Sequence, residues 1–210
     1  MEQLQQLLKN YNLKHQLDFS GMEWPLQYCS DVFPSYWKII FSIVKQIPKD
    51  SRVLEIGSGL GFVTSILLYR GFSNVVGYER DKGLAEKANR RLHELFDSEN
   101  IIMPENYSNQ KGMYDVVILA NCVYPDGIKS KIQYIDQIKE YFKNSGEPRY
   151  FIIEVIDSSF TKQDMDFPEY IRLSSDDIES MFPTSKIKSW TTYKYPINKK
   201  SKRLYCIETI

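Results

Sequence analysis

Apolar and polar residues alternate along this chain with two different periods. Short continuous apolar runs predict buried strands at residues 52–56, 74–78, 101–103, 114–120 and 150–156. Apolar residues three or four positions apart predict helices at residues 61–69, 81–96, 126–142 and 174–181. Strand and helix therefore alternate, which is typical of parallel strands joined by helices.

The end of the chain has a different pattern. Residues 187–195 and 203–210 form two apolar stretches joined by the polar sequence PINKKSK, which predicts an antiparallel hairpin. Because crossover helices cover both faces of a parallel sheet, we predict an α/β fold with a doubly wound, mostly parallel seven-stranded sheet. The C-terminal hairpin forms its antiparallel edge, and an N-terminal helical cap precedes the first strand.

The first 48 residues form this predicted cap. Residues 1–16 and 34–47 have helical spacing, and Pro48 ends the second helix. The aromatic-rich stretch 19–37 reads as an ordered loop, which either completes a core or lines a substrate pocket as a lid. We therefore divide the chain into a cap or lid at 1–48 and a main domain at 49–210.

Composition narrows the function classes. The 27 basic and 27 acidic side chains balance, so no overall charge attracts nucleic acid or a membrane surface. Three widely spaced cysteines do not suggest a disulfide framework, and two histidines without a cysteine cluster predict no metal site. No apolar run could span a bilayer, and the N-terminus lacks a signal-peptide pattern, which predicts a cytoplasmic protein.

The sequence VLEIGSGLGF carries the clearest chemical signal. A predicted strand reaches Glu55, three glycines follow at alternate positions, and a predicted helix begins, so a ligand can approach backbone N–H groups closely. The dinucleotide fingerprint would place its third glycine where Phe62 stands. The Glu55 carboxylate would also repel a pyrophosphate, whereas it suits a cationic group. The loop therefore favours a ligand other than a nicotinamide dinucleotide.

This stretch resembles the first motif of class I S-adenosylmethionine-dependent methyltransferases, and the resemblance covers roughly residues 50–156. It implies that Glu55 lies near the amino group of the cofactor, that Glu79 after the second strand holds the ribose hydroxyls, and that Arg80 flanks the adenine. A carboxylate suits the ribose because it accepts two hydrogen bonds at once. The loop residues implied to pass under the methionine part are Gly57, Ser58, Gly59 and Gly61.

The same resemblance implies contacts after the third and fourth strands. Either Glu105 or Asn106 would accept a hydrogen bond from the adenine amino group. The sequence YDVVILANCVYPD resembles the fourth motif of the family, so Asn121 and Tyr124 follow a strand at the edge where ligands bind. Both would orient the methyl acceptor, and Asn121 would also contact the cofactor.

Methyl transfer needs positioning more than a catalytic triad, because the cofactor carries the activation. Glu154 and Asp157, at the end of the fifth strand, would act as a base or anchor a cationic substrate. We predict an S-adenosylmethionine-dependent methyltransferase that acts on oxygen or nitrogen of a small molecule and releases S-adenosylhomocysteine. Nucleic acid and membranes are not expected as partners, and the oligomeric state stays open.

Two alternatives remain from the sequence. The first is methylation of RNA or protein through residues 186–203, which hold seven basic side chains and no acid. Such a basic hairpin is otherwise a solvated edge that prevents strand pairing. The second alternative is a protein that binds S-adenosylmethionine without methyl transfer activity.

Overall fold

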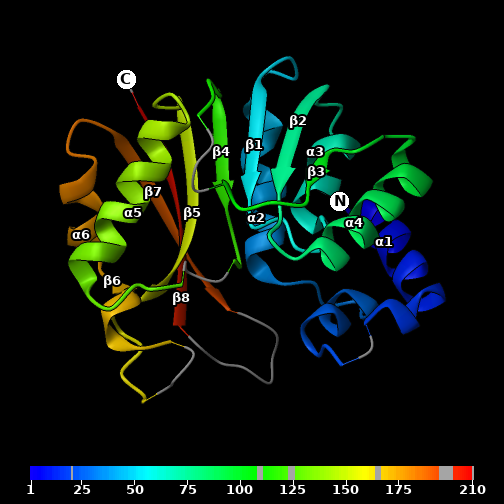
Figure 1. Ribbon diagram of the computed structural model, residues 1–210, viewed down its shortest axis with the longest axis horizontal. Coiled ribbons are helices and arrows are strands. Elements are labelled where there is room, and N and C mark those ends of the chain that lie inside the picture. The colour runs from blue at the N-terminus through cyan, green and yellow to red at the C-terminus, as the bar shows by residue number, and fades with distance from the viewer. Residues whose placement is uncertain (20, 108–110, 123–125, 164–166, 194–200, 210) are drawn as a thin grey trace.

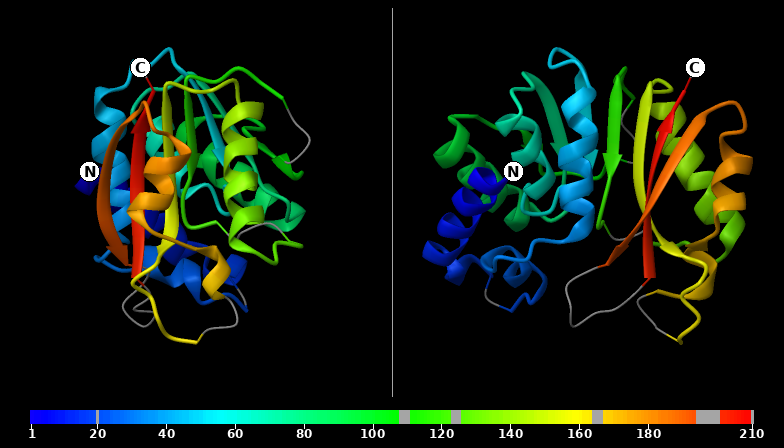
Figure 2. Two further views of the ribbon diagram at one scale, coloured as in Figure 1. Left: turned by 90° about the vertical axis from the view of Figure 1, so that its left-hand side faces the viewer. Right: turned by 180° about the vertical axis from the view of Figure 1, so that it is seen from behind.

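One eight-stranded sheet with helices on both faces forms the centre of the molecule (Figure 1, Figure 2). The computed structural model describes residues 1–19, 21–107, 111–122, 126–163, 167–193 and 201–209. The strands are β1 (Arg52–Ile56), β2 (Asn74–Tyr78), β3 (Ile102–Met103), β4 (Val116–Leu119), β5 (Tyr150–Asp157), β6 (Arg172–Leu173), β7 (Lys186–Tyr193) and β8 (Ser201–Glu208).

The strand order is β3-β2-β1-β4-β5-β8-β7, and β6 pairs with β5 outside this path. The first five strands of this order are parallel, whereas β8 runs antiparallel to both β5 and β7. This arrangement confirms the predicted doubly wound, mostly parallel seven-stranded sheet with an antiparallel C-terminal hairpin. The additional strand β6 has two residues, too few to show a period in the sequence.

Helices connect the strands and cover the sheet. The α-helices are α1 (Glu2–Lys14), α2 (Ser35–Ile43), α3 (Phe62–Tyr69), α4 (Lys82–Phe96), α5 (Lys131–Asn144) and α6 (Ser175–Met181). The helix predicted from residue 126 begins later, because the Ser130 side chain accepts from the backbone N–H of Gln133 and caps α5. A capping box formed by Ser174 and Asp177 is present at the start of α6.

Alternate residues of the central strands face two separate hydrophobic cores. In β5, Ile152 packs into a core shared with α2, α3 and the N-terminal segment. Its neighbours Phe151 and Ile153 pack into a second core with α5 and α6. Because strand side chains alternate between faces, this division decides which polar residues of a strand can meet in one site.

The N-terminal segment packs into the first core. Leu8 of α1, Tyr28 of the 3₁₀ helix η2 (Trp24–Cys29) and Trp37 of α2 are all fully buried there. The indole N–H of Trp37 donates to the Phe62 carbonyl at 2.9 Å, which ties α2 to α3. The stretch predicted as an ordered loop thus contains η2, and the division of the chain at residue 48 stays a prediction.

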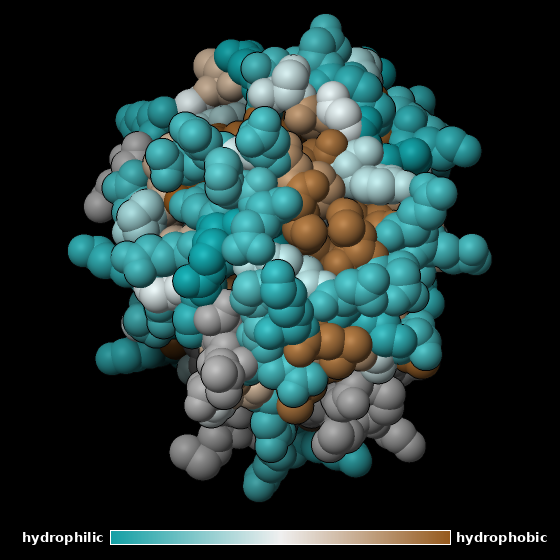
Figure 3. Space-filling model, turned by 90° about the vertical axis from the view of Figure 1, so that its right-hand side faces the viewer, coloured by the Kyte–Doolittle hydropathy of each residue, from teal (hydrophilic) through white to brown (hydrophobic). Residues whose placement is uncertain are grey.

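The segment that contains α1 and η2 lies at one end of the sheet. Figure 1 shows this blue segment on the side toward which the arrowheads of β1 and β2 point. Figure 3 shows that the face bearing α1 and α4 is mostly hydrophilic, with a small apolar patch near its centre. No helix among the described residues is long and apolar enough to cross a membrane. Within the same residues, no group of histidine, cysteine and acidic side chains could hold a metal ion.

Candidate active site

The glycine loop turns from β1 into α3 through backbone conformations that favour glycine. Gly57, Gly59 and Gly61 have φ angles of 72°, 53° and 70°, in the left-handed region that other residues rarely adopt. A β-carbon at Gly57 would lie 2.4 Å from the Cβ of Cys122, so a side chain there would displace the loop after β4. The N–H groups of Gly57 and Ser58 both donate to the last carbonyl of β2, which fixes the loop against that strand.

A cavity of about 360 Å³ lies at the carboxyl ends of β1, β2 and β4, the edge at which ligands bind in open parallel sheets. The predicted residue Gly61 is the N-terminal cap residue of α3 and does not line the cavity. The predicted residue Tyr124 falls outside the described residues. The other predicted residues of the cofactor site line the cavity, and so do two predicted catalytic residues, Asn121 and Glu154. The full set is Glu55, Gly57, Ser58, Gly59, Glu79, Arg80, Glu105, Asn106, Asn121 and Glu154.

Glu79 follows β2 and holds the glycine loop. One carboxylate oxygen accepts from the Gly59 backbone N–H at 2.7 Å, and the other accepts from the Asp81 N–H at 2.9 Å. A carboxylate has about four lone-pair sites, so two acceptor sites remain for a ligand. Glu79 can therefore receive two hydroxyl groups while it keeps the loop in place.

Glu55 is buried at the carboxyl end of β1, with 2% of its surface exposed. Burial raises the pKa of Glu55 to about 8, while a hydrogen bond from the Thr64 hydroxyl opposes this rise and the nearby Glu79 charge adds to it. A cation bound in the cavity would favour the ionised carboxylate. The ionisation state of Glu55 therefore depends on the charge of a bound ligand.

The far end of the cavity holds the residues predicted to face adenine. Arg80 donates to the Asp126 carboxylate at 2.8 Å, so an exposed ion pair fixes its guanidinium. Glu105 and Asn106 both line the cavity after β3, and Tyr107 beside them is buried. The geometry leaves the choice between Glu105 and Asn106 open.

A buried polar cluster forms the opposite end of the cavity. Glu154 of β5 accepts from the Asn121 backbone N–H at 3.1 Å and from the Thr192 hydroxyl at 2.6 Å. The Lys202 ammonium lies 3.4 Å from the Glu154 carboxylate and donates to the Asn121 side-chain oxygen at 3.1 Å. The interpretation of the hairpin as a solvated basic edge is therefore wrong for Lys202, which is 5% exposed.

Sequence reasoning did not assign Thr192 and Lys202 to the site, although a signal for Lys202 was present. Lys202 lies two and four positions before Leu204 and Cys206, which are both buried in the first core. Because strand side chains alternate, Lys202 shares their buried face. Thr192 pairs with Lys202 across β7 and β8, a register that the sequence alone does not reveal.

Asp157 does not join this cluster. Its carboxylate accepts from Arg203 at 2.7 Å and from the Ser159 backbone N–H at 2.9 Å. Burial raises the pKa of Asp157, but these hydrogen bonds outweigh it, and the pKa lies below its usual value. Glu154 and Asp157 are three positions apart on β5, so they point to opposite faces of the sheet. The structure brings only Glu154 to the cavity.

Aromatic residues of the N-terminal segment complete the cavity wall. Trp24 and Tyr36 line it, and the Tyr36 hydroxyl is hydrogen-bonded to the hydroxyl of the buried Tyr28. The Tyr28 ring stacks on Phe62 at the start of α3, with 3.5 Å between ring centroids. The segment therefore contributes both to the core and to the cavity, the two roles that the sequence left open.

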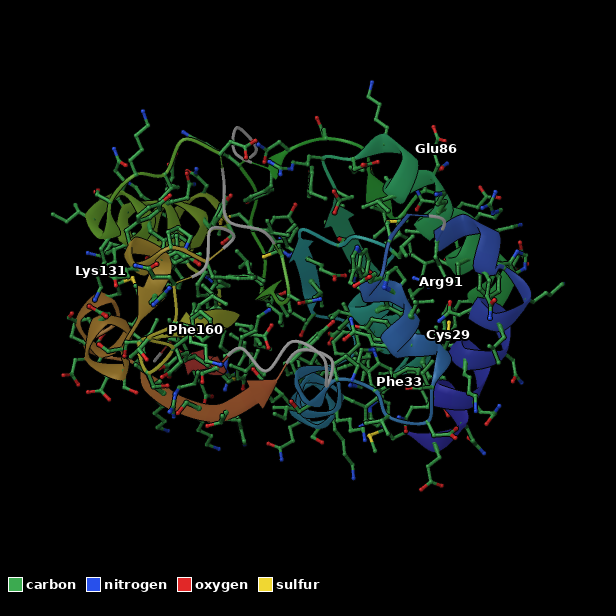
Figure 4. All side chains as sticks on the ribbon, turned by 90° about the horizontal axis from the view of Figure 1, so that it is seen from below. Cys29, Phe33, Glu86, Arg91, Lys131 and Phe160 are labelled. Carbon is green, nitrogen blue, oxygen red and sulfur yellow. The ribbon has the colours of Figure 1, made fainter. Side chains whose placement is uncertain are left out.

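Arg91 of α4 contacts both the N-terminal segment and the start of α3. Its guanidinium lies 4.0 Å from the Phe62 ring centroid and donates to the Asn12 side-chain oxygen at 3.1 Å. Figure 4 shows Arg91 on the same side of the molecule as Cys29 and Phe33, opposite Lys131 and Phe160. The buried charge thus links α1, α3 and α4 next to the glycine loop.

Comparison with known families decides the class of this site. A family model described as a methyltransferase domain matches residues 30–192, which is most of the chain. The chain belongs to the methyltransferase domain family. This membership confirms the predicted class, an S-adenosylmethionine-dependent methyltransferase, and with it the predicted cofactor.

Individual curated relatives match only part of the methyltransferase. Protein-L-isoaspartate O-methyltransferase from Photorhabdus laumondii is 31% identical over 100 residues, which are 46% of this chain and 47% of that protein. The corresponding protein from Alteromonas mediterranea is 40% identical over 76 residues, 34% of this chain and 35% of that protein. The match thus spans less than half of either curated relative.

A solved structure shares the fold of the methyltransferase over nearly its whole length. Magnesium protoporphyrin IX methyltransferase from Synechocystis PCC 6803, with bound S-adenosylmethionine, superimposes with a TM-score of 0.62 and 15% identity. The superposition covers 98% of this chain and 97% of that chain. It supports the sheet order and the position of the N-terminal helix.

The residues present fit S-adenosylmethionine. Glu79 keeps two acceptor sites for the ribose hydroxyls, and Glu55 offers a carboxylate that a cationic amino group would ionise. Without a β-carbon at Gly57, the turn after β1 clears Cys122 and stays close to the cavity. The individual contacts to the cofactor stay predictions.

Proposed function

We propose that this methyltransferase transfers a methyl group from S-adenosylmethionine to an oxygen or nitrogen atom of a small molecule. The observation that carries the proposal is that a single cavity is lined by the glycine loop, by the buried Glu154, and by Trp24 and Tyr36 of the N-terminal segment. A cavity whose wall includes aromatic side chains suits a small molecule better than a polymer.

The proposed roles at the cofactor end are those that the family resemblance implies, and they are supported by the residues that line the cavity. When bound, S-adenosylmethionine supplies an activated methyl group whose leaving group is a neutral thioether. Glu79 accepts hydrogen bonds from the ribose hydroxyls, and Glu55 lies near the amino group. Either Glu105 or Asn106 contacts the adenine, and Arg80 flanks it. The glycine loop passes under the methionine part.

The proposed roles at the acceptor end belong to Asn121 and Glu154. Asn121 orients the acceptor atom, because Lys202 fixes its side chain at the carboxyl end of β4. Glu154 holds the Asn121 backbone and forms a compensated ion pair with Lys202, while the Thr192 hydroxyl donates to its other oxygen. Tyr124, outside the described residues, stays a predicted contact of the acceptor.

A protein acceptor is the second candidate. Both curated relatives are named protein-L-isoaspartate O-methyltransferases, so an isoaspartyl peptide is a specific substrate to test. RNA has weaker support, because Lys202 and Arg203 of the basic hairpin are engaged with Glu154 and Asp157. Those two cations are therefore not offered to phosphates.

Transfer of labelled methyl groups tests the proposal. The protein is incubated with S-adenosylmethionine carrying a tritiated methyl group and with three acceptor sets: small phenols, carboxylic acids and amines; an isoaspartyl peptide; and total RNA. We expect label in a small molecule, loss of label with Glu79→Ala, and unchanged transfer with the exposed control Glu86→Gln. Label confined to the peptide or RNA would contradict the small-molecule proposal. Cofactor binding without any labelled product would support the non-catalytic alternative.

A further inference from the structure

Lys202 of β8 contacts two residues that line the cavity, Asn121 and Glu154. It lies opposite Ile156 of β5 and Thr192 of β7, and its side chain extends along the sheet to Glu154. The side chain of Lys202 is 6% exposed and that of Glu154 is 1% exposed. A buried ammonium and a buried carboxylate are stable together only when each compensates the other.

The same ammonium determines how the Asn121 side chain is turned. Lysine only donates hydrogen bonds, so the Asn121 atom at 3.1 Å from its Nζ must be the amide oxygen. The amide nitrogen then lies on the other side of the side chain. Asn121 lines the cavity, so its N–H groups are what it can offer to a bound acceptor.

The backbone of Asn121 is held by the same cluster. Its φ angle is 55°, a left-handed conformation that few residues other than glycine and asparagine adopt. The backbone N–H donates to Glu154, and Lys202 anchors the side chain, so both parts of the residue depend on one ion pair. Loss of the pair would release the residue from both constraints.

We propose that Lys202 is a positioning residue that turns the Asn121 amide N–H groups toward the acceptor and makes the site selective for an oxygen nucleophile. The inference rests on the proposed function and narrows it. A donor N–H matches a carboxylate, phenolate or hydroxyl oxygen, which has lone pairs to accept it. A neutral amine uses its single lone pair to attack the methyl group and has none left to accept the N–H. The compensated Glu154 provides little net negative charge to attract the protonated form of an amine.

Two cofactor analogues test this proposal without knowledge of the substrate. S-adenosylhomocysteine has a neutral thioether, whereas sinefungin carries an amine in place of the transferred methyl group. The ratio of their dissociation constants, measured by calorimetry at pH 8.5, reports how the acceptor end treats a cationic nitrogen. We expect the wild type to bind sinefungin no more than about tenfold more tightly than S-adenosylhomocysteine, because the Glu154 charge is compensated. A larger preference for sinefungin would overturn the selectivity for oxygen.

Variants of the ion pair should move this ratio in opposite directions. Lys202→Met leaves the Glu154 charge uncompensated and should shift the ratio toward sinefungin by at least roughly fivefold. Lys202→Arg keeps the positive charge and should keep the wild-type ratio. Glu154→Gln leaves the lysine charge uncompensated and should disfavour sinefungin by a similar factor. It also keeps the test decisive if Lys202→Met does not fold.

A neighbouring ion pair provides the matched control. Arg203 is adjacent to Lys202 on β8 and pairs with the buried Asp157 on the opposite face of the sheet. Arg203→Met should therefore leave the ratio unchanged. If both Lys202→Met and Glu154→Gln still bind S-adenosylhomocysteine and their ratios equal that of the wild type, the role of Lys202 is refuted. Failure of the wild type to bind S-adenosylhomocysteine would instead refute the proposed function.

Discussion

Replacing Glu55 with glutamine should remove a large pH dependence of stability between about pH 5 and pH 8. Burial raises the pKa of Glu55 from 4.5 to about 8, so the folded protein keeps this carboxyl group protonated where the unfolded chain ionises it. Glutamine has nearly the same shape, can accept the Thr64 hydrogen bond through its amide oxygen, and never ionises.

The sign and size follow from proton linkage. Below about pH 4.5 the carboxyl group is neutral in both states, so its favourable contribution to folding is fully present. As the pH rises toward 8, the unfolded state gains stability by ionising, and the contribution is lost. A pKa rise from 4.5 to about 8 corresponds to about 5 kcal/mol at roughly 1.4 kcal/mol for each pH unit. Asp157 and Asp177, whose pKa values are lowered, instead lose their contributions below about pH 4.

Urea unfolding of the cofactor-free protein, followed by tryptophan fluorescence from pH 5 to pH 8.5, measures this effect. The wild type should lose several kcal/mol of unfolding free energy across the interval, while Glu55→Gln should show a nearly flat profile. Glu86→Gln, an exposed change on α4, should follow the wild type. Parallel profiles for the wild type and Glu55→Gln would refute the conclusion that burial holds Glu55 protonated.

Two further predictions concern the glycine loop and its cover. Gly57→Ala should cost roughly 2–4 kcal/mol of stability and most of the S-adenosylhomocysteine affinity, because its φ is 72° and its β-carbon would meet Cys122 at 2.4 Å. Gly71→Ala, at φ 83° with open space, should cost only about 1 kcal/mol, and equal losses in thermal unfolding would contradict the steric argument. Trp24→Ala should weaken S-adenosylhomocysteine about fivefold in calorimetry, because the Trp24 ring lies 3.4 Å from the β-carbon position of Gly59; unchanged affinity would show that this ring does not cover the cofactor.

The order of elements and the cofactor end of the site could be predicted because both are encoded locally. The alternation of strand-like and helix-like hydrophobic patterns predicted five parallel strands. One continuous motif contains Glu55 and the glycine loop. Glu79 follows the next strand, so its place at the same sheet edge follows from parallel topology. These inferences need no knowledge of contacts between distant residues.

The acceptor end could be predicted only in part because it depends on strand register and side-chain alternation. Glu154 and Asp157 were assigned the same role at a strand end, although a spacing of three places them on opposite faces of the sheet. Lys202 looked like part of a solvated basic hairpin, yet its face is continued by Leu204 and Cys206. Its contact with Glu154 joins residues 48 positions apart in sequence, which no local pattern reveals.

Calorimetric titration with S-adenosylhomocysteine tests the central claim that the cavity beside the glycine loop holds the cofactor through Glu79. The Glu79 carboxylate accepts from Gly59 and Asp81, and hydrogen bonds to a charged group contribute about 1.5–3 kcal/mol each. We predict one binding site in the wild type, no binding of NAD, and at least roughly thirtyfold weaker S-adenosylhomocysteine binding in a folded Glu79→Ala variant. Undiminished affinity in that variant, or tight binding of NAD by the wild type, would contradict the account.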